Sequence, residues 1–168
     1  MFKLTKNKRS PIILVGLILI WTITIGIGLA TARETNNISN NEINNNFQLG
    51  KELYLENCAT CHIGVPPEVL PTETWRRLLQ DKQHYGVEIK PPINPPRLLI
   101  WNYLQTLSRP QGEGEELAYR VAKSRYFQAI HPRVKMPRDL HLSTCITCHP
   151  GVKEYNFRQL TPEWENSP

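Results

Sequence analysis

The amino-acid sequence predicts a mainly α-helical protein, in which a small helical domain follows an N-terminal transmembrane helix. Residues 11–32 carry no charged side chain and are long enough to cross a bilayer as a helix. Beyond them, apolar side chains recur at helical spacing in several segments. No alternating pattern of useful length predicts a strand.

Residues 1–32 are typical of a signal anchor or transmembrane segment. Four basic residues precede the apolar run and should stay on the inner side of the membrane, which places the rest of the chain outside. The apolar run is longer than the core of a usual signal peptide, which favours a retained anchor. Residues 30–32, Ala-Thr-Ala, match a small-residue cleavage site, so secretion after cleavage following Ala32 is the alternative.

The net charge of +5 arises mostly at the N-terminus. Four of the twenty Lys and Arg residues precede the apolar run, which leaves sixteen against all fifteen Asp and Glu residues in the remainder. The part of the chain beyond residue 32 is therefore nearly neutral. The charge indicates membrane topology, and we expect no nucleic-acid partner.

Residues 33–46 are rich in Asn and poor in large apolar side chains, which predicts a flexible tether. We place the folded domain at residues 47–162 and a short tail at 163–168. Helices are predicted over residues 47–57 and 72–82, which carry apolar side chains on one side.

The proline-rich segment 90–96 should separate two halves of the domain. Asn94 can cap a following helix that has Pro95 at its first position and extends to about residue 107. A loop is expected over residues 108–114. A further helix is expected over residues 115–127, with acidic residues at its N-terminus, and the tail should be irregular.

All four cysteines lie in two C-x-x-C-H motifs. The motifs consist of Cys58, Cys61 and His62, and of Cys145, Cys148 and His149. A single C-x-x-C pair could be a redox dithiol or half of a zinc site. Two copies, each completed by histidine with no cysteine left over, favour covalent haem attachment. We therefore predict two covalently attached haem c groups, each with its iron bound by the motif histidine.

The opposite face of each iron needs a second ligand, and the remaining candidates are His84, His131, His141 and Met136. His84 is the only free histidine or methionine between the two motifs that lies in the first half of the domain, so we assign it to the first haem. The alternative for His84 is a surface histidine at a helix C-terminus, where a cation is favourable.

The second haem has three candidate ligands. His131 precedes a proline just after an amphipathic segment, and we favour it. Met136-Pro137 is similar to a methionine–proline ligand loop, but such loops follow the haem motif, whereas this one precedes it. Met136 could instead pack against a haem face. His141 lies four residues before Cys145 and could bind iron, the local backbone or a haem propionate.

With these residues in view, the chain resembles the small bacterial dihaem cytochrome c family over about residues 48–160. The resemblance is carried by both haem motifs, by Trp75, by His84-Tyr85-Gly86 and by the aromatic-rich helix that includes Tyr103. It implies a periplasmic electron carrier with histidine on both faces of each haem. By the same resemblance, His84 and His131 are the distal ligands, and some members donate electrons to a small haem protein.

We therefore expect an electron-transfer protein, not an enzyme, that works with redox protein partners. It should be membrane-anchored, with its haem domain in the periplasm or a thylakoid lumen. The alternatives are a haem-based gas sensor or small redox enzyme with one open haem site, and an accessory subunit of a membrane electron-transfer complex. Residues 117–138 contain six basic and no acidic side chains, which predicts either a docking patch or a solvated face that pairs with haem propionates.

Overall fold

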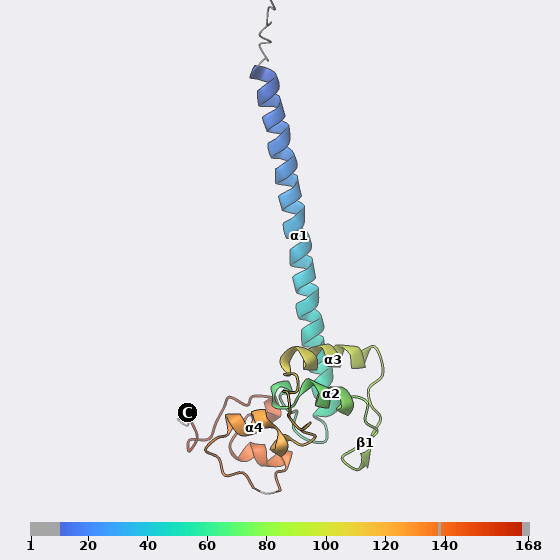
Figure 1. Ribbon diagram of the computed structural model, residues 1–168, viewed down its shortest axis with the longest axis vertical. Coiled ribbons are helices and arrows are strands. Elements are labelled where there is room, and N and C mark those ends of the chain that lie inside the picture. Colours follow the sequence, from blue (N-terminus) through green and yellow to red (C-terminus); the bar gives the residue numbers. More distant parts are fainter. Residues whose placement is uncertain (1–10, 138, 166–168) are drawn as a thin grey trace, which may run out of the picture. The chain divides into compact units, whose positions relative to one another are not determined.

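The computed structural model describes residues 11–137 and 139–165. The chain divides into two compact units, residues 1–44 and residues 45–168. Helix α1 has the bounds Pro11–Cys58 (Figure 1). Its first part belongs to the first unit, and its last turns, from residue 45 onward, belong to the second.

The described part of the first unit, residues 11–44, is helical backbone. Its described apolar side chains include Ile12 and Ile20, which are 80% and 61% exposed. Among residues 11–137 and 139–165, no helix meets the length and hydropathy that a membrane span requires. The basic residues that precede the apolar run lie outside the described residues, as do Arg138 and the last three residues of the tail. The transmembrane segment thus stays a prediction.

The backbone of residues 33–46 is helical, in the segment for which the sequence predicts a flexible tether. The segment contains neither glycine nor proline, so no residue in it interrupts the backbone hydrogen bonds. Helix propagation costs much less than nucleation, and the segment is flanked by helix on both sides. Composition alone did not indicate this helical backbone, and both the tether and the domain boundary at residue 47 stay predictions.

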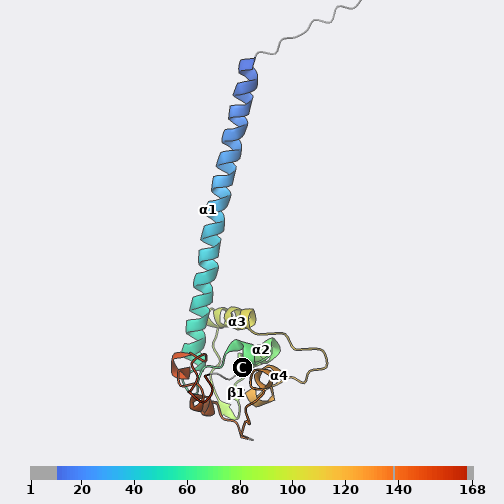
Figure 2. The ribbon, with the colours of Figure 1, turned by 90° about the vertical axis from the view of Figure 1, so that its left-hand side faces the viewer.

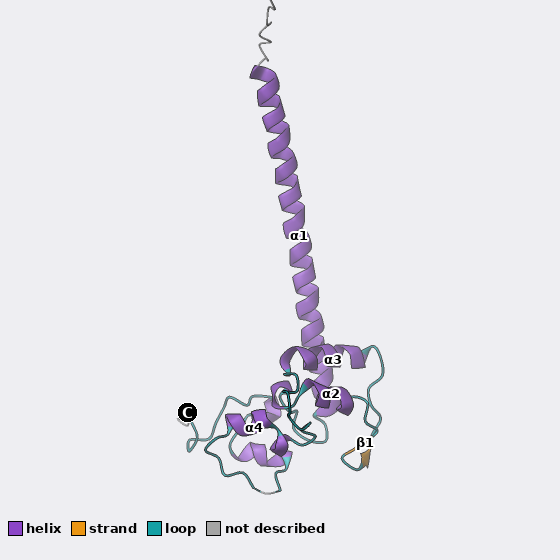
Figure 3. Ribbon diagram, viewed as in Figure 1, coloured by secondary structure: helices purple, strands orange, loops and turns teal. Residues whose placement is uncertain are grey.

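The second unit is a small, mainly helical domain, as expected (Figure 3). Beyond α1 its α-helices are α2 (Thr72–Leu78), α3 (Pro96–Leu107) and α4 (Arg125–Ile130). Four short 3-10 helices are η1 (Pro67–Val69), η2 (Val121–Lys123), η3 (Leu142–Thr147) and η4 (Val152–Glu154). Strands β1 (Gln83–His84) and β2 (Val87–Glu88) pair antiparallel, with His84 opposite Val87. In both views of the ribbon, α2 lies between α3 and α4 (Figures 1 and 2).

An aromatic core joins the last turns of α1 to α2 and α3. The Tyr54 ring packs edge-on against Trp75, with centroids 5.9 Å apart, and lies 5.7 Å from the Tyr103 ring. All three side chains are buried, and the Tyr54 hydroxyl donates a hydrogen bond of 2.6 Å to the Val65 carbonyl. This bond ties the loop after the first haem motif to the helix before it.

Helix α2 ends at Leu78, four residues before the predicted end at Lys82. The Asp81 carboxylate accepts a hydrogen bond of 2.9 Å from the Gln83 backbone N–H, and the Ile89 N–H bonds to the Lys82 carbonyl. These bonds draw the chain into the β1–β2 hairpin. Aspartate that bonds to the backbone two residues later competes with helix, and this competition explains the early end.

Helix α3 begins one residue later than predicted. Pro95 is the N-cap and Pro96 is the first helical residue. Asn94 precedes the cap through a cis peptide bond, and its side chain makes no capping bond. A proline does occupy the first position, but it is Pro96 and not the predicted Pro95, and the predicted asparagine cap is wrong.

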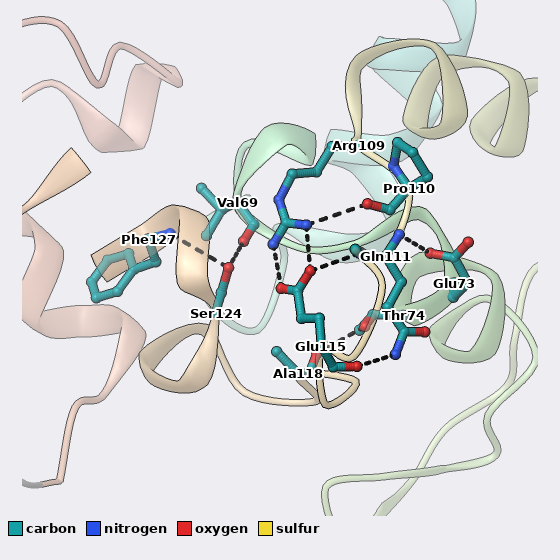
Figure 4. Close-up of polar contacts among 11 residues, drawn as sticks. Val69, Glu73, Thr74, Arg109, Pro110, Gln111, Glu115, Ala118, Ser124 and Phe127 are labelled. Atoms are coloured by element: carbon teal, nitrogen blue, oxygen red, sulfur yellow. Dashed lines mark hydrogen bonds and ion pairs between the residues drawn. The ribbon is translucent and has the colours of Figure 1, made fainter. Parts of the chain in front are cut away.

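The predicted helix over residues 115–127 is replaced by a loop, η2 and the short α4 (Figure 4). The Arg109 guanidinium donates two hydrogen bonds, of 2.8 and 2.6 Å, to the Glu115 carboxylate. The Gly112 N–H donates a third bond to the same carboxylate. The Arg109 bond is the main cause that lowers the pKa of Glu115 to about 2, with the Gly112 bond second. The glutamate is thus engaged by the preceding loop and does not start a helix.

Two further bonds hold residues 118–124 away from helical geometry. The Thr74 hydroxyl donates to the Ala118 carbonyl at 2.8 Å, and the Ser124 hydroxyl donates to the Val69 carbonyl. The Ser124 hydroxyl also accepts from the Phe127 N–H and caps α4. These bonds come from segments about fifty residues earlier in the chain, so no local pattern could reveal them.

Gly50 allows α1 to approach α3 closely. A Cβ atom at this position would lie 2.5 Å from the backbone carbonyl oxygen of Leu99. We expect Gly50→Ala to lower the free energy of unfolding by about 1–3 kcal/mol, because one helix must move away from the other. Chemical denaturation of the haem-loaded protein measures the effect. Gln48→Ala, at an exposed position on the same helix, is the matched control, and equal stability of the two variants would contradict the close approach.

Candidate haem sites

The first haem motif begins at the last residue of α1. Cys58 is partly buried, Cys61 is exposed, and burial raises the pKa of the Cys58 thiol to about 11. Burial also raises the pKa of Cys145 in the second motif. Burial of this kind disfavours a charged thiolate, so it suits a neutral thioether link better than a metal-bound thiolate.

The first site pairs His62 with His84. Their ring centroids lie 6.2 Å apart and the ring planes are 22° from parallel. His84 is the last residue of β1, directly before a two-residue hairpin turn formed by Tyr85 and Gly86. Both turn residues have positive φ angles, 51° and 92°, as a type I′ turn requires. The hairpin is therefore the element that presents His84 to the first motif.

The second site pairs His149 with His131. Their ring centroids lie 6.1 Å apart and the planes are almost perpendicular, at 89°. His131 is the C-cap of α4, where the helix ends before Pro132, and its ring lies against the Phe127 ring at 4.4 Å. His149 follows η3, and its backbone N–H bonds to the Cys145 carbonyl at 2.8 Å.

Both histidine pairs have the spacing that a shared metal ion requires. A bond from metal to imidazole nitrogen is about 2 Å, so two imidazoles that bind one ion from opposite sides have their centres about 6 Å apart. The measured separations of 6.2 and 6.1 Å match this requirement. The four histidines therefore fit two irons, with His62 and His84 on one and His149 and His131 on the other.

Backbone carbonyls orient three of the four imidazoles. Nδ1 of His62 bonds to the Ile63 carbonyl at 2.7 Å, Nδ1 of His149 to the Phe157 carbonyl at 2.8 Å, and Nδ1 of His131 to the Phe127 carbonyl at 2.8 Å. A carbonyl accepts only, so Nδ1 carries the proton and Nε2 keeps its lone pair for a metal.

Burial favours the neutral, metal-binding form of two of the imidazoles, those of His84 and His149. Desolvation is the largest cause that lowers the pKa of His84, with nearby His62 as a second cause and Asp81 opposing. Desolvation likewise lowers the pKa of His149, although its bond to Phe157 opposes the shift. Neutral imidazole is the ligand form, so both shifts favour iron binding near neutral pH.

The two rejected candidates for the second haem lie elsewhere. Met136 packs against the hydrophobic core and, with His131 and Phe127, lines a pocket of about 300 Å³. His141 is exposed, and its backbone carbonyl accepts a hydrogen bond from Thr144 at the start of η3. The structure therefore places His131 opposite the motif histidine, while Met136 has the position of an apolar neighbour.

The segment after the second motif forms part of the wall of the first site. A pocket of about 570 Å³ is lined by Cys61 and His62 and also by Lys153 and Tyr155. The Tyr155 hydroxyl lies 3.2 Å from that of Tyr103 in the aromatic core. Tyr155 follows the second motif in the chain, and no pattern in the sequence indicated its place at the first site.

An aromatic path connects the two sites. The Phe157 ring lies 5.9 Å from the His149 ring and 5.8 Å from the Tyr155 ring, which in turn lies 6.4 Å from Tyr54. These rings come from both halves of the domain. They show that the two sites share one continuous packed interior.

Sequence reasoning also missed how the hairpin is held. The Tyr85 hydroxyl donates a hydrogen bond to the Tyr119 carbonyl, and the Arg120 guanidinium lies 5.0 Å above the Tyr85 ring. A cation over an aromatic face is attracted by the ring. The only local signal was the Tyr85-Gly86 dipeptide. It is compatible with a tight turn, but it does not indicate that Tyr119 and Arg120 hold the turn in place.

Comparison with known proteins agrees with this geometry. The fold and the two paired-histidine sites define a c-type cytochrome with two haems. The family model for dihaem cytochrome c matches residues 54–157. The chain belongs to the dihaem cytochrome c family, whose members carry two covalently bound c-type haems with iron. Searches among curated proteins and among solved structures found no match.

The histidine pairs predict which substitutions would leave one coordination position of an iron without a protein ligand. We expect His84→Ala and His131→Ala each to create one haem that binds carbon monoxide in the reduced state, because each removes one axial ligand. The wild-type protein should bind none, and His141→Ala should behave like the wild type. Visible spectra of the reduced proteins with and without carbon monoxide measure this. If His141→Ala binds carbon monoxide and His131→Ala does not, the pairing of His131 with His149 is refuted.

Proposed function

We propose that this protein relays electrons through its two haems and is not an enzyme. The observation that carries the proposal is the pair of opposed imidazoles at each site, 6.2 and 6.1 Å apart. A ligand on both faces leaves no iron position for a substrate. Membership of the dihaem cytochrome c family supports electron transfer as the general role.

Bound haem iron supplies the change between ferrous and ferric states. The chain's own residues hold the ligands in place during that change. Three Nδ1 hydrogen bonds to backbone carbonyls fix the ring orientations, and the aromatic core around Tyr54 and Tyr103 supports the surrounding segments. Rigid ligands need little rearrangement when the charge on the iron changes, which favours rapid transfer.

The shared interior supports transfer between the two haems within one chain. Tyr155 and Phe157 follow the second motif, yet Tyr155 also lines the pocket beside His62. Neighbouring rings along this path have centroids within 6.4 Å of each other. We therefore infer that an electron enters at one haem and leaves from the other.

A basic surface near the second site supports docking of an acidic redox protein. Among the described residues, Lys123 belongs to η2, and Arg133 and Lys135 follow His131; all three are exposed. Acidic residues are absent from residues 117–137. Complementary charge accelerates encounter between proteins and makes the rate depend on salt.

The docking proposal predicts a salt-dependent loss of rate. The double variant Lys123→Glu/Lys135→Glu should exchange electrons with a small acidic redox protein at least about ten times more slowly at low salt, and the difference should shrink at high salt. Stopped-flow absorbance of the haem bands measures the rate. The double variant Arg76→Glu/Arg97→Glu, on α2 and α3, makes the same change in net charge and is the matched control. If both reversals slow the reaction equally, the loss reflects net charge and the local surface is not the docking site.

We also propose that the protein is held at a membrane by its N-terminal segment, with the haem domain on the outer side. The uncharged run of residues 11–32 and the basic residues before it support this proposal. Maturation of c-type haems outside the bacterial cytoplasm agrees with this orientation.

Membrane retention predicts the behaviour of a chimaera. The full chain should sediment with membranes in high salt and carbonate and be released only by detergent. A version with residues 1–32 replaced by a cleavable signal peptide should be soluble in the exported fraction with both haems attached. Release of the unaltered chain without detergent, with an N-terminus at residue 33, would favour cleavage after Ala32.

A further inference from the structure

The two histidine pairs differ in how their outer nitrogens are satisfied. At the second site, Nδ1 of His149 and Nδ1 of His131 each have a backbone carbonyl partner at 2.8 Å. At the first site, Nδ1 of His62 has such a partner at 2.7 Å. Nδ1 of His84, by contrast, is buried and has no hydrogen-bond partner among the described residues.

This difference changes how strongly the ligands donate electrons to iron. A hydrogen bond from Nδ1–H to a carbonyl increases the negative character of the imidazole and raises its basicity as a ligand. A more basic ligand stabilises ferric iron over ferrous iron and so lowers the reduction potential. The second site has two ligands strengthened in this way, whereas the first has one.

The ring planes also differ between the sites, at 22° in the first and 89° in the second. Nearly parallel imidazoles split two of the iron d orbitals and give ferric haem a resolved rhombic EPR spectrum. Perpendicular imidazoles leave those orbitals almost equal in energy and give a ramp-shaped signal at lower field. The two haems therefore carry separate spectroscopic labels that arise from the fold.

We propose that the first haem, held by His62 and His84, has the higher reduction potential and is where a single electron resides, because His84 alone lacks an acceptor for its Nδ1 proton. The proposal rests on the electron-transfer function and adds a direction to it. An electron that enters at the second haem, beside the basic surface, moves downhill to the first haem.

Charged side chains near the sites also shift the potentials and must be controlled. Arg120, over the Tyr85 ring beside His84, raises the potential of the first haem, whereas the following charges act in the opposite sense. Asp81 lies near His84, where a negative charge lowers the potential of the first haem. The exposed Arg133 and Lys135 follow His131, where positive charge raises the potential of the second. Exposed charges are screened by salt, whereas the hydrogen bond of a ligand is not. High ionic strength therefore isolates the contribution of the ligands.

The test is a redox titration of the wild-type two-haem protein at high salt, with samples frozen at each potential for EPR. As the potential is lowered, we expect the rhombic ferric signal to disappear before the ramp-shaped one. His84→Ala should remove the rhombic signal alone and His131→Ala the ramp-shaped signal alone, and these variants assign each signal to its haem.

Each outcome is decisive. Loss of the ramp-shaped signal first, or loss of both signals at one potential, overturns the proposal while both irons remain low-spin and the electron-transfer function stands. Two rhombic signals overturn the inference from the ring planes, and the variants then still show which haem is reduced first. A high-spin signal in the wild-type protein means that one iron lacks a second imidazole, and this result contradicts the proposed function itself.

Discussion

The structure depends on holding two imidazoles at metal-binding distance across each haem site. In each pair one histidine belongs to a haem motif and the other comes from a different element. His84 lies on a hairpin beyond α2, and His131 lies at the end of α4. Covalent attachment fixes only the motif side, so the fold must supply the other ligand with a precision of tenths of an ångström. The hairpin that carries His84 and the end of α4 that carries His131 serve that requirement.

The distal ligands are positioned by different means. The His84 hairpin is short and has only a two-residue ladder, so it depends on Tyr85 and its contacts with Tyr119 and Arg120. His131 is placed by a helix end, and that helix is itself held by the buried Ser124, which bonds both to Val69 and to Phe127. Residues 119–124 contribute to both arrangements, through Tyr119 and Arg120 at the hairpin and through Ser124 at α4.

The aromatic core has a double role in the domain. Tyr54, Trp75 and Tyr103 are buried, and their apolar area contributes much of the core of this small domain. Small domains bury a smaller fraction of their surface than large ones, so each large buried side chain matters more. The same cluster contacts Tyr155, which belongs to the segment after the second motif. The two haem sites are thus parts of one packed unit, and this continuity is what a relay between two haems needs. The relative orientation of the two imidazole planes also differs between the sites, at 22° in the first and 89° in the second.

The sequence by itself determined the chemistry of this protein. The residues for haem attachment are contiguous in the chain, so the two C-x-x-C-H motifs and the helix that leads into the first were predictable from local patterns. The sequence also narrowed the distal ligands to a few candidates. Only the tertiary structure placed His131 rather than Met136 or His141 opposite His149, because that choice depends on where α4 ends. The tertiary structure also replaced the expected helix over residues 115–127 by a loop, through hydrogen bonds from Thr74 and Ser124 to distant carbonyls. Contacts between residues far apart in the chain leave no periodic signal, and those contacts decide the geometry of both sites.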